Sequence, residues 1–154
     1  ELFASVVGRF AQGVRVETRA CPEFVRLVEA GEITSARARE TVRRCLAPLL
    51  AAGMDQLVLG CTHFPFLSEA IQAEAGPGVT LIDPSPAVAR QIGRMLRDRD
   101  ALNPAGAPGC VTCYTTGGPD AFRAVLGTLL GAEFAEKADV RAAAWEGDRL
   151  YALS

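Results

Sequence analysis

Lysine and histidine are scarce in this 154-residue chain, which contains one of each, Lys137 and His63. The other basic residues are arginines, and the formal net charge is only −2 at pH 7. A charge this small provides no electrostatic field that would steer the chain toward DNA, RNA or an acidic membrane surface. We therefore expect neither a nucleic acid nor a membrane among its partners.

Long apolar runs are also absent, and none approaches the ~20 residues that a membrane-spanning helix requires. A hydrophobic content of 49% with 22% charged residues is typical of a globular domain rather than a disordered chain. The five cysteines are an odd number, which argues against a fully paired disulfide framework. With no export signal visible, we expect reduced thiols and a cytoplasmic location. The helical pattern that begins at Glu1 predicts a piece of a longer protein.

Apolar periodicity predicts strands that alternate with helices along the chain. The expected helices cover residues 2–11, 22–30, 34–52, 67–75, 85–99 and 120–130, and the expected strands 14–18, 55–60, 79–82, 110–114, 139–142 and 149–152. Such alternation predicts an α/β fold with a largely parallel, doubly wound sheet. The strand at 55–60 is apolar enough to be covered on both faces, and residues 100–109 form the expected linker.

The chemistry of the chain is concentrated at the end of the strand predicted at 55–60, where Cys61, Thr62 and His63 follow one another. Ligands of open α/β sheets bind at the carboxyl ends of strands. A cysteine reacts as its thiolate, which a nearby histidinium or helix N-terminus favours. Thr62 and the free N–H groups of the turn suit a carboxylate. Such a thiolate can attack a carbon, bind a metal or remove a proton, and spacing alone does not separate these possibilities.

The stretch from Leu59 to Leu67 (Leu-Gly-Cys-Thr-His-Phe-Pro-Phe-Leu) resembles the second catalytic motif of bacterial glutamate racemases, in the aspartate/glutamate racemase family. Residues 20–31, 81–84 and 114–117 resemble other segments of that family in the same order, so the likeness spans about residues 1–131. The resemblance implies a two-lobe fold. Residues 1–88 would form the second, carboxy-terminal lobe with the cysteine motif, and residues 89–154 would return to a first lobe that is missing.

The resemblance implies a cofactor-independent, metal-free racemisation of L-glutamate to D-glutamate for peptidoglycan synthesis, and thus for the cell wall and cell shape. In that mechanism one cysteine thiolate removes the α-proton and a second cysteine returns a proton to the opposite face. Cys61 would be the second of these cysteines and His63 would assist it. Glu29 would orient His63, and Thr62 would help to bind the substrate. The full-length family member is expected to be a homodimer.

The first catalytic cysteine motif of that family has no counterpart in this chain, so we expect the chain to be inactive alone. The segment that would return to the first lobe should expose apolar side chains, including Val111, Leu126 and Leu130. Cys21 and Cys45 are expected to be structural. Cys110 and Cys113 have the spacing of a zinc or redox pair, but in a strand their thiols would point to opposite faces.

Two alternatives remain beside the glutamate racemase interpretation. An aspartate or hydantoin racemase would share the fold, although relatives that act on aspartate usually carry an acidic residue where this chain has His63. The other alternative, from a different class, is a non-catalytic α/β module that binds a metal or presents a thiol.

Overall fold

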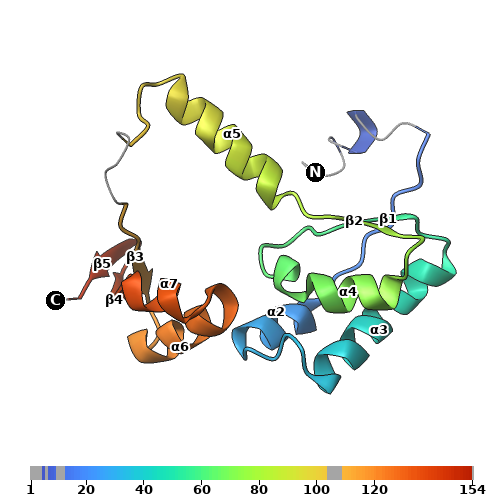
Figure 1. Ribbon diagram of the computed structural model, residues 1–154, viewed down its shortest axis with the longest axis horizontal. Coiled ribbons are helices and arrows are strands. Elements are labelled where there is room, and N and C mark those ends of the chain that lie inside the picture. Colours follow the sequence, from blue (N-terminus) through green and yellow to red (C-terminus); the bar gives the residue numbers. More distant parts are fainter. Residues whose placement is uncertain (1–4, 6, 10–12, 104–108, 154) are drawn as a thin grey trace.

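The computed structural model describes residues 5, 7–9, 13–103 and 109–153. The first part of the fold contains α2 (Pro22–Glu29), α3 (Ala36–Ala51), β1 (Gln56–Val58), the 3-10 turn η1 (Phe64–Leu67), α4 (Ser68–Ala75) and β2 (Thr80–Ile82). A long helix, α5 (Ser85–Arg97), then leads away from β2 (Figure 1). The last part contains β3 (Thr112–Thr115), α6 (Pro119–Leu130), α7 (Ala132–Lys137), β4 (Asp139–Glu146) and β5 (Arg149–Ala152).

The first helices begin and end where local chemistry predicts. Pro22 is the first residue of α2, where a backbone N–H would have no partner within the helix, so the lack of an N–H in proline costs no hydrogen bond. Gly31 follows that helix with a φ of +69°, a conformation that glycine adopts without steric cost. The Ser35 hydroxyl accepts a hydrogen bond from the Ala38 N–H at 3.0 Å and so caps α3. Both helices lie within two residues of the predicted bounds.

The hydrophobic core lies where α2, α3, η1 and α4 meet. Val28 and Val42 have no exposed surface, and Leu67 and Ile71 are each 1% exposed. Leu59 continues from β1 into the same core and is 3% exposed. This packing covers one side of the β1–β2 pair and leaves Val58 60% exposed. The expectation that the strand at 55–60 is covered on both faces is therefore wrong.

The described strands form two separate sheets. β1 and β2 pair in parallel with Leu57 opposite Leu81, and β3 pairs in parallel with β4, which in turn pairs antiparallel with β5. The predicted α/β class with parallel strands is confirmed. The strand predicted at 14–18 is wrong, because this segment is extended but pairs with no strand within the described ranges. The helix α7 was not predicted.

The helix expected at residues 2–11 falls largely outside the described residues, although residues 5 and 7–9 are helical. None of the described helices is both long and apolar enough to cross a membrane.

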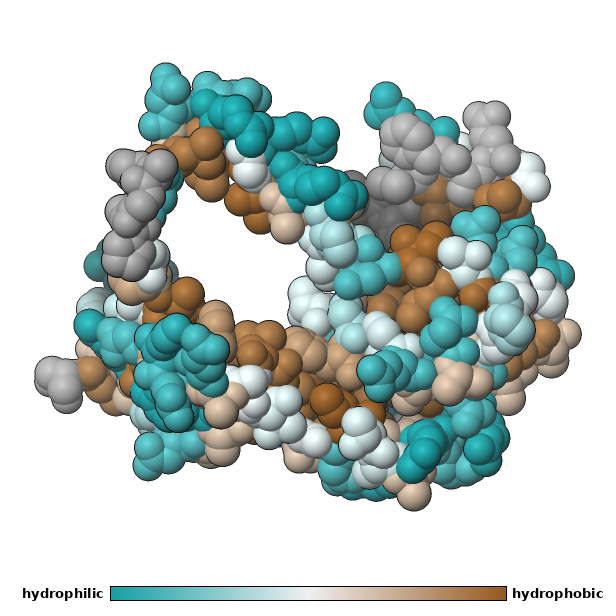
Figure 2. Space-filling view, in the orientation of Figure 1, coloured by the Kyte–Doolittle hydropathy of each residue, from teal (hydrophilic) through white to brown (hydrophobic). Residues whose placement is uncertain are grey.

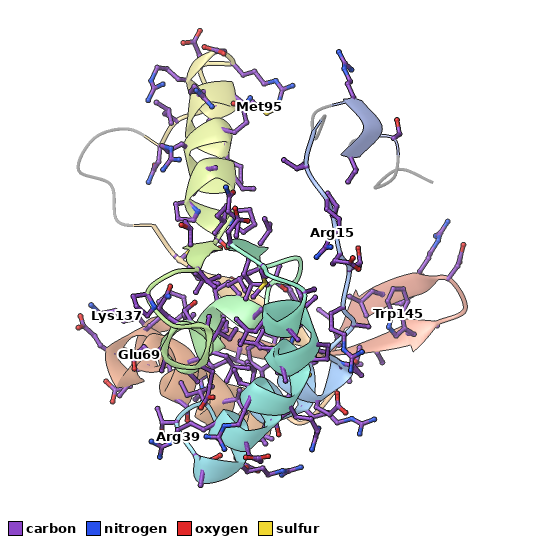
Figure 3. The ribbon with its side chains drawn as sticks, turned by 90° about the vertical axis from the view of Figure 1, so that its right-hand side faces the viewer. Arg15, Arg39, Glu69, Met95, Lys137 and Trp145 are labelled. Atoms are coloured by element: carbon purple, nitrogen blue, oxygen red, sulfur yellow. The ribbon has the colours of Figure 1, made fainter. Side chains whose placement is uncertain are left out.

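The helix α5 has no buried residue. Its apolar side chains face the open space between α5 and the rest of the molecule (Figure 2). Met95 on this helix and Trp145 on β4 both stand away from the packed core (Figure 3), with 40% and 63% of their surface exposed. The predicted exposure of Val111 and Leu130 is confirmed at 46% and 50%, whereas Leu126 is half-buried.

Candidate active site

Cys61 lies in the bend that follows β1, at the carboxyl end of that strand. The Leu59 N–H donates to the Ile82 carbonyl at 3.0 Å, which fixes the start of the bend against β2. The Phe64 N–H donates to the Cys61 carbonyl at 3.2 Å and closes the turn into η1. The thiol is half-buried. The predicted position of the cysteine, between a strand and the beginning of a helical segment, is therefore observed.

Cys61, His63 and Glu29 form a continuous chain of polar contacts. The Cys61 Sγ lies 3.8 Å from His63 Nδ1, and His63 Nε2 lies 2.7 Å from Glu29 Oε1. A carboxylate only accepts hydrogen bonds, so this contact favours a proton on Nε2 and leaves Nδ1 of the neutral ring free to accept. The arrangement can take the thiol proton onto His63 and stabilise the resulting cation with Glu29, which is the chemistry of a cysteine used as a general base.

Glu29 reaches this turn because α2 packs directly against it. Phe24, on the same helix, meets the Phe64 ring edge to face, with ring centroids 5.2 Å apart and an interplanar angle of 72°. Phe64 and Phe66 are partly buried and pack against the core. Phe24 was not among the predicted site residues, although its position on the helix that carries Glu29 was a usable signal.

Thr62 lies on the same turn but is exposed, and its hydroxyl makes no hydrogen bond within the described part of the chain. The fold thus brings three of the four predicted site residues into contact and leaves Thr62 beside them. Its suggested role in holding a substrate stays a prediction, as do the roles of the other three.

The remaining cysteines have different environments. Burial, together with a hydrogen bond to the neighbouring thiol of Cys45, raises the pKa of Cys21 to about 12, so its thiol stays protonated at neutral pH. Cys45 is 5% exposed within the core. Cys110 is exposed and Cys113 half-buried, and both are free thiols. No group of three or more His, Cys, Asp or Glu side chains in the described ranges is arranged to hold a metal ion.

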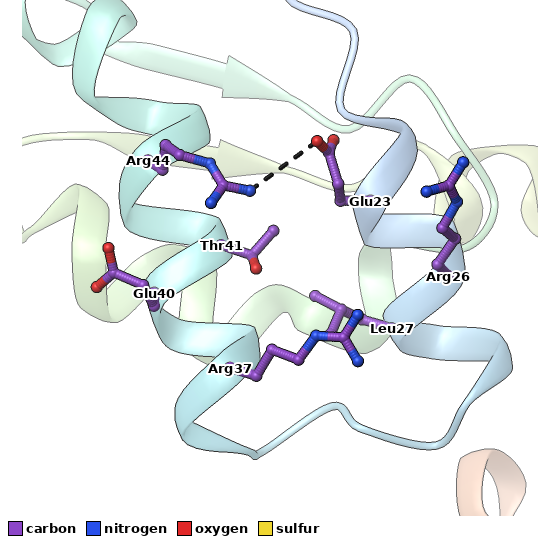
Figure 4. A pocket seen from close by; sticks show the side chains of 7 residues that line it. All are labelled: Glu23, Arg26, Leu27, Arg37, Glu40, Thr41 and Arg44. Carbon is purple, nitrogen blue, oxygen red and sulfur yellow. Dashed lines mark ion pairs between the residues drawn. The ribbon is translucent and has the colours of Figure 1, made fainter.

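Two pockets lie away from this cluster. One, of about 240 Å³, opens between α2 and α3 (Figure 4), where Arg44 lies 3.9 Å from Glu23; it is lined by Glu23, Arg26, Leu27, Arg37, Glu40, Thr41 and Arg44. The other, of about 420 Å³, is lined by Gly109, Cys110, Val111, Phe134, Lys137 and Ala138. Neither of these two pockets includes Cys61 or His63.

Comparison with known proteins links this geometry to one family. The model of the Asp/Glu/Hydantoin racemase family matches residues 5–92. A glutamate racemase from Herpetosiphon aurantiacus is 48% identical over 122 residues, which cover 79% of this chain and 48% of the relative. A glutamate racemase from Symbiobacterium thermophilum is 43% identical over 121 residues, which cover 79% and 44%.

Solved structures give the same result for the fold. A glutamate racemase isoform from Bacillus anthracis matches 92% of this chain and 51% of its own, with 26% identity and a TM-score of 0.78. The Thermus thermophilus glutamate racemase in complex with β-chloro-D-alanine is 36% identical over 80% of this chain and 46% of its own, with a TM-score of 0.67. The chain spans about half the length of the relatives that it matches.

Proposed function

Because this chain belongs to the Asp/Glu/Hydantoin racemase family, we propose that it supplies one of the two proton-transferring faces of a glutamate racemase. The observation that carries the proposal is the chain of contacts from Cys61 through His63 to Glu29. Glutamate is favoured as substrate because the similar proteins are named glutamate racemases, and one solved relative, from Francisella tularensis, is in complex with D-glutamate. The family resemblance favours glutamate as well, because His63 stands where relatives that act on aspartate would be expected to carry an acidic residue.

The proposed chemistry begins with transfer of the Cys61 thiol proton to His63 Nδ1, 3.8 Å away. The Glu29 carboxylate, 2.7 Å from Nε2, stabilises the imidazolium. The Cys61 thiolate then removes the α-proton of glutamate, or returns one in the reverse direction. An α-proton beside a carboxylate is a very weak acid, so carbanion-like charge has to be stabilised by N–H donors, such as those of the turn that contains Thr62. The mechanism needs no cofactor.

Inversion at the α-carbon requires a second acid–base group on the opposite face. Cys21 is a poor candidate, because it is 7% exposed and its pKa is raised to about 12. We infer that this group is a cysteine of the half of the racemase that this chain does not span. Residues 1–88 would then form the lobe that carries Cys61, and residues 89–154 would pack against that other half. The whole enzyme would act in the cytoplasm as a homodimer that supplies D-glutamate for peptidoglycan.

The proposal can be tested with two proteins: the 154-residue chain alone, and a full-length chimera in which it replaces the matching segment of the Herpetosiphon aurantiacus racemase. The optical rotation of glutamate measures racemisation, and proton NMR in D₂O measures α-proton exchange. We expect racemisation by the chimera only, with at most slow deuterium exchange into L-glutamate by the chain alone. An inactive but folded chimera would contradict the proposed activity. Sustained racemisation by the isolated monomer would show that this chain supplies both faces.

Metal dependence separates this proposal from a metal-binding module. With no suitable ligand group in the described residues, the chimera should keep its activity after exhaustive chelation. A loss that added zinc restores would overturn the thiol–imidazole mechanism.

A further inference from the structure

The turn that carries His63 is attached to α2 at two points. The His63 Nε2–H donates to Glu29 Oε1 at 2.7 Å, and Phe24 holds Phe64 through the ring contact at 5.2 Å. His63 and Phe64 are consecutive residues, whereas Phe24 and Glu29 are separated by about 7.5 Å along the axis of α2. Two attachments so spaced restrict how the turn can rotate or slide relative to the helix.

The two attachments differ in how strongly they can fix the turn. The Glu29 side chain is 64% exposed and that of His63 30% exposed, so water competes with their contact. Phe24 is 2% exposed and belongs to the hydrophobic core, so its ring has a fixed position. An edge-to-face aromatic pair shifts a local equilibrium by roughly 2- to 10-fold. The ring pair is therefore the attachment that can determine where the imidazole lies.

We propose that Phe24 is a positioning residue, which holds the turn through Phe64 so that His63 lies between the Cys61 thiol and the Glu29 carboxylate. Its importance for catalysis rests on the proposed racemase function, whereas its effect on the position of His63 does not. Phe24 acts only through Phe64 and touches no reacting group.

Three variants of the 154-residue chain test this role. Phe24→Leu removes one ring and keeps an apolar side chain. Phe64→Tyr keeps both rings and adds only a hydroxyl, for which the half-buried position of Phe64 leaves room. Val42→Ala is the matched control, because Val42 is fully buried in the same core but belongs to α3, and not to α2 or the turn. Circular dichroism establishes that each variant folds. If Phe24→Leu does not fold, Phe64→Leu removes the same ring pair from its more exposed side.

Two measurements report on the turn directly. The first is hydrogen exchange of the Phe64 and Phe66 amides, which donate to the Cys61 and His63 carbonyls, each at 3.2 Å. The second is the ¹⁵N chemical shifts of the two His63 ring nitrogens, which report the tautomer. In Phe24→Leu we expect exchange at both amides to become roughly 2- to 10-fold faster. We also expect the two ring nitrogen shifts to move toward each other as the tautomers mix.

Phe64→Tyr should keep both signatures of the original chain, and Val42→Ala should lower stability without changing the His63 shifts. Unchanged exchange and unchanged shifts in Phe24→Leu would overturn the proposal, as would an equal change of the His63 shifts in Val42→Ala. These readouts do not depend on turnover. If they behave as expected while Cys61→Ser leaves the chimera fully active, the racemase mechanism fails and the positioning role of Phe24 stands.

Discussion

Residues 21–82 and residues 85–153 use their apolar side chains in opposite ways. The first region buries large side chains, such as Phe24, Leu46, Leu67 and Ile71, in one core. The buried apolar residues described in the second region are the small side chains Ala135, Ala138 and Ala143. The candidate catalytic groups lie in the first region, where packing can hold a side chain in place. The second region leaves large apolar side chains such as Val111, Leu130 and Trp145 exposed.

The two regions meet at the carboxyl end of α2. A Cβ at Gly31 would lie 3.3 Å from the Thr128 methyl group, so glycine permits the close approach of α6 to this turn. Leu129 of α6 also packs against the core of the first region. The contact lies two residues beyond Glu29, which makes α2 the element that joins the second region to the candidate site.

The largest difference between the regions should appear in catalysis. We expect Cys61→Ser to lower the turnover of the full-length chimera by ~10²–10⁴-fold, because a serine hydroxyl is too weak an acid to replace a positioned general base. Cys113→Ser makes the same chemical change in β3 of the second region and should leave turnover nearly unchanged. Turnover is followed by the optical rotation of glutamate. If Cys61→Ser kept more than about a tenth of the activity, Cys61 would not be the base.

Truncation of a leucine to alanine should lower the free energy of unfolding much more in the first region than in the second. Leu67→Ala is expected to lower the free energy of unfolding by ~2–5 kcal/mol, because it opens a cavity in a core where Leu67 is 1% exposed. Leu96→Ala on α5 makes the same truncation at a side chain that is 38% exposed, and should cost less than ~1 kcal/mol. Urea unfolding of the chain measures both values. Equal losses would show that α5 is packed as tightly as the core.

The pH dependence of stability should distinguish the buried Cys21 from the exposed Cys110. The pKa of Cys21 is raised to about 12 in the folded chain, whereas a cysteine of the unfolded chain ionises near ~8.5. Because the folded chain holds the Cys21 proton more tightly, the full free energy of unfolding is present below about pH 8.5. It decreases as the pH rises toward the pKa of Cys21 in the folded chain, by at most about 1.4 kcal/mol per pH unit.

Urea unfolding under reducing conditions, from about pH 8 to about pH 10.5, follows this loss. Cys21→Ala should flatten the decline, and Cys110→Ala should leave it as steep as in the original chain. A decline that Cys21→Ala does not change would place the responsible group elsewhere.

The smallest effect is expected on the apolar face of α5. Ile92→Glu adds a charge to a side chain that is 52% exposed, so the free energy of unfolding should change by no more than ~0.5 kcal/mol. Self-association of the chain, measured by sedimentation, should decrease because the apolar patch is interrupted. Arg90→Glu, a larger charge change on the opposite side of the helix, serves as the control. If both variants dissociate the chain equally, net charge and not this face governs association.

Local sequence determined the elements that depend on neighbouring residues. Pro22, Ser35 and Gly31 fix the ends of α2 and α3 through backbone geometry and capping, which act within a few residues. The sequence also placed Cys61 and His63 at the end of a strand, because a short apolar run followed by glycine predicts that position. The exposure of Val111 and Leu130 was predicted differently, from the resemblance to a two-lobe family whose first lobe is missing here.

Only the tertiary structure decided the features that depend on residues far apart in the chain. The alternating residues 14–18 are no strand, because a strand needs a neighbour to accept its hydrogen bonds and these residues pair with none of the described strands. Val58 is exposed because packing covers one side of β1 only. The contact of Glu29 with His63 joins residues 34 positions apart; the family resemblance suggested it, and the packing of α2 against the turn through Phe24 and Phe64 brings it about. The number of residues between Glu29 and His63 does not predict the distance between their side chains, because burial and side-chain packing determine that distance.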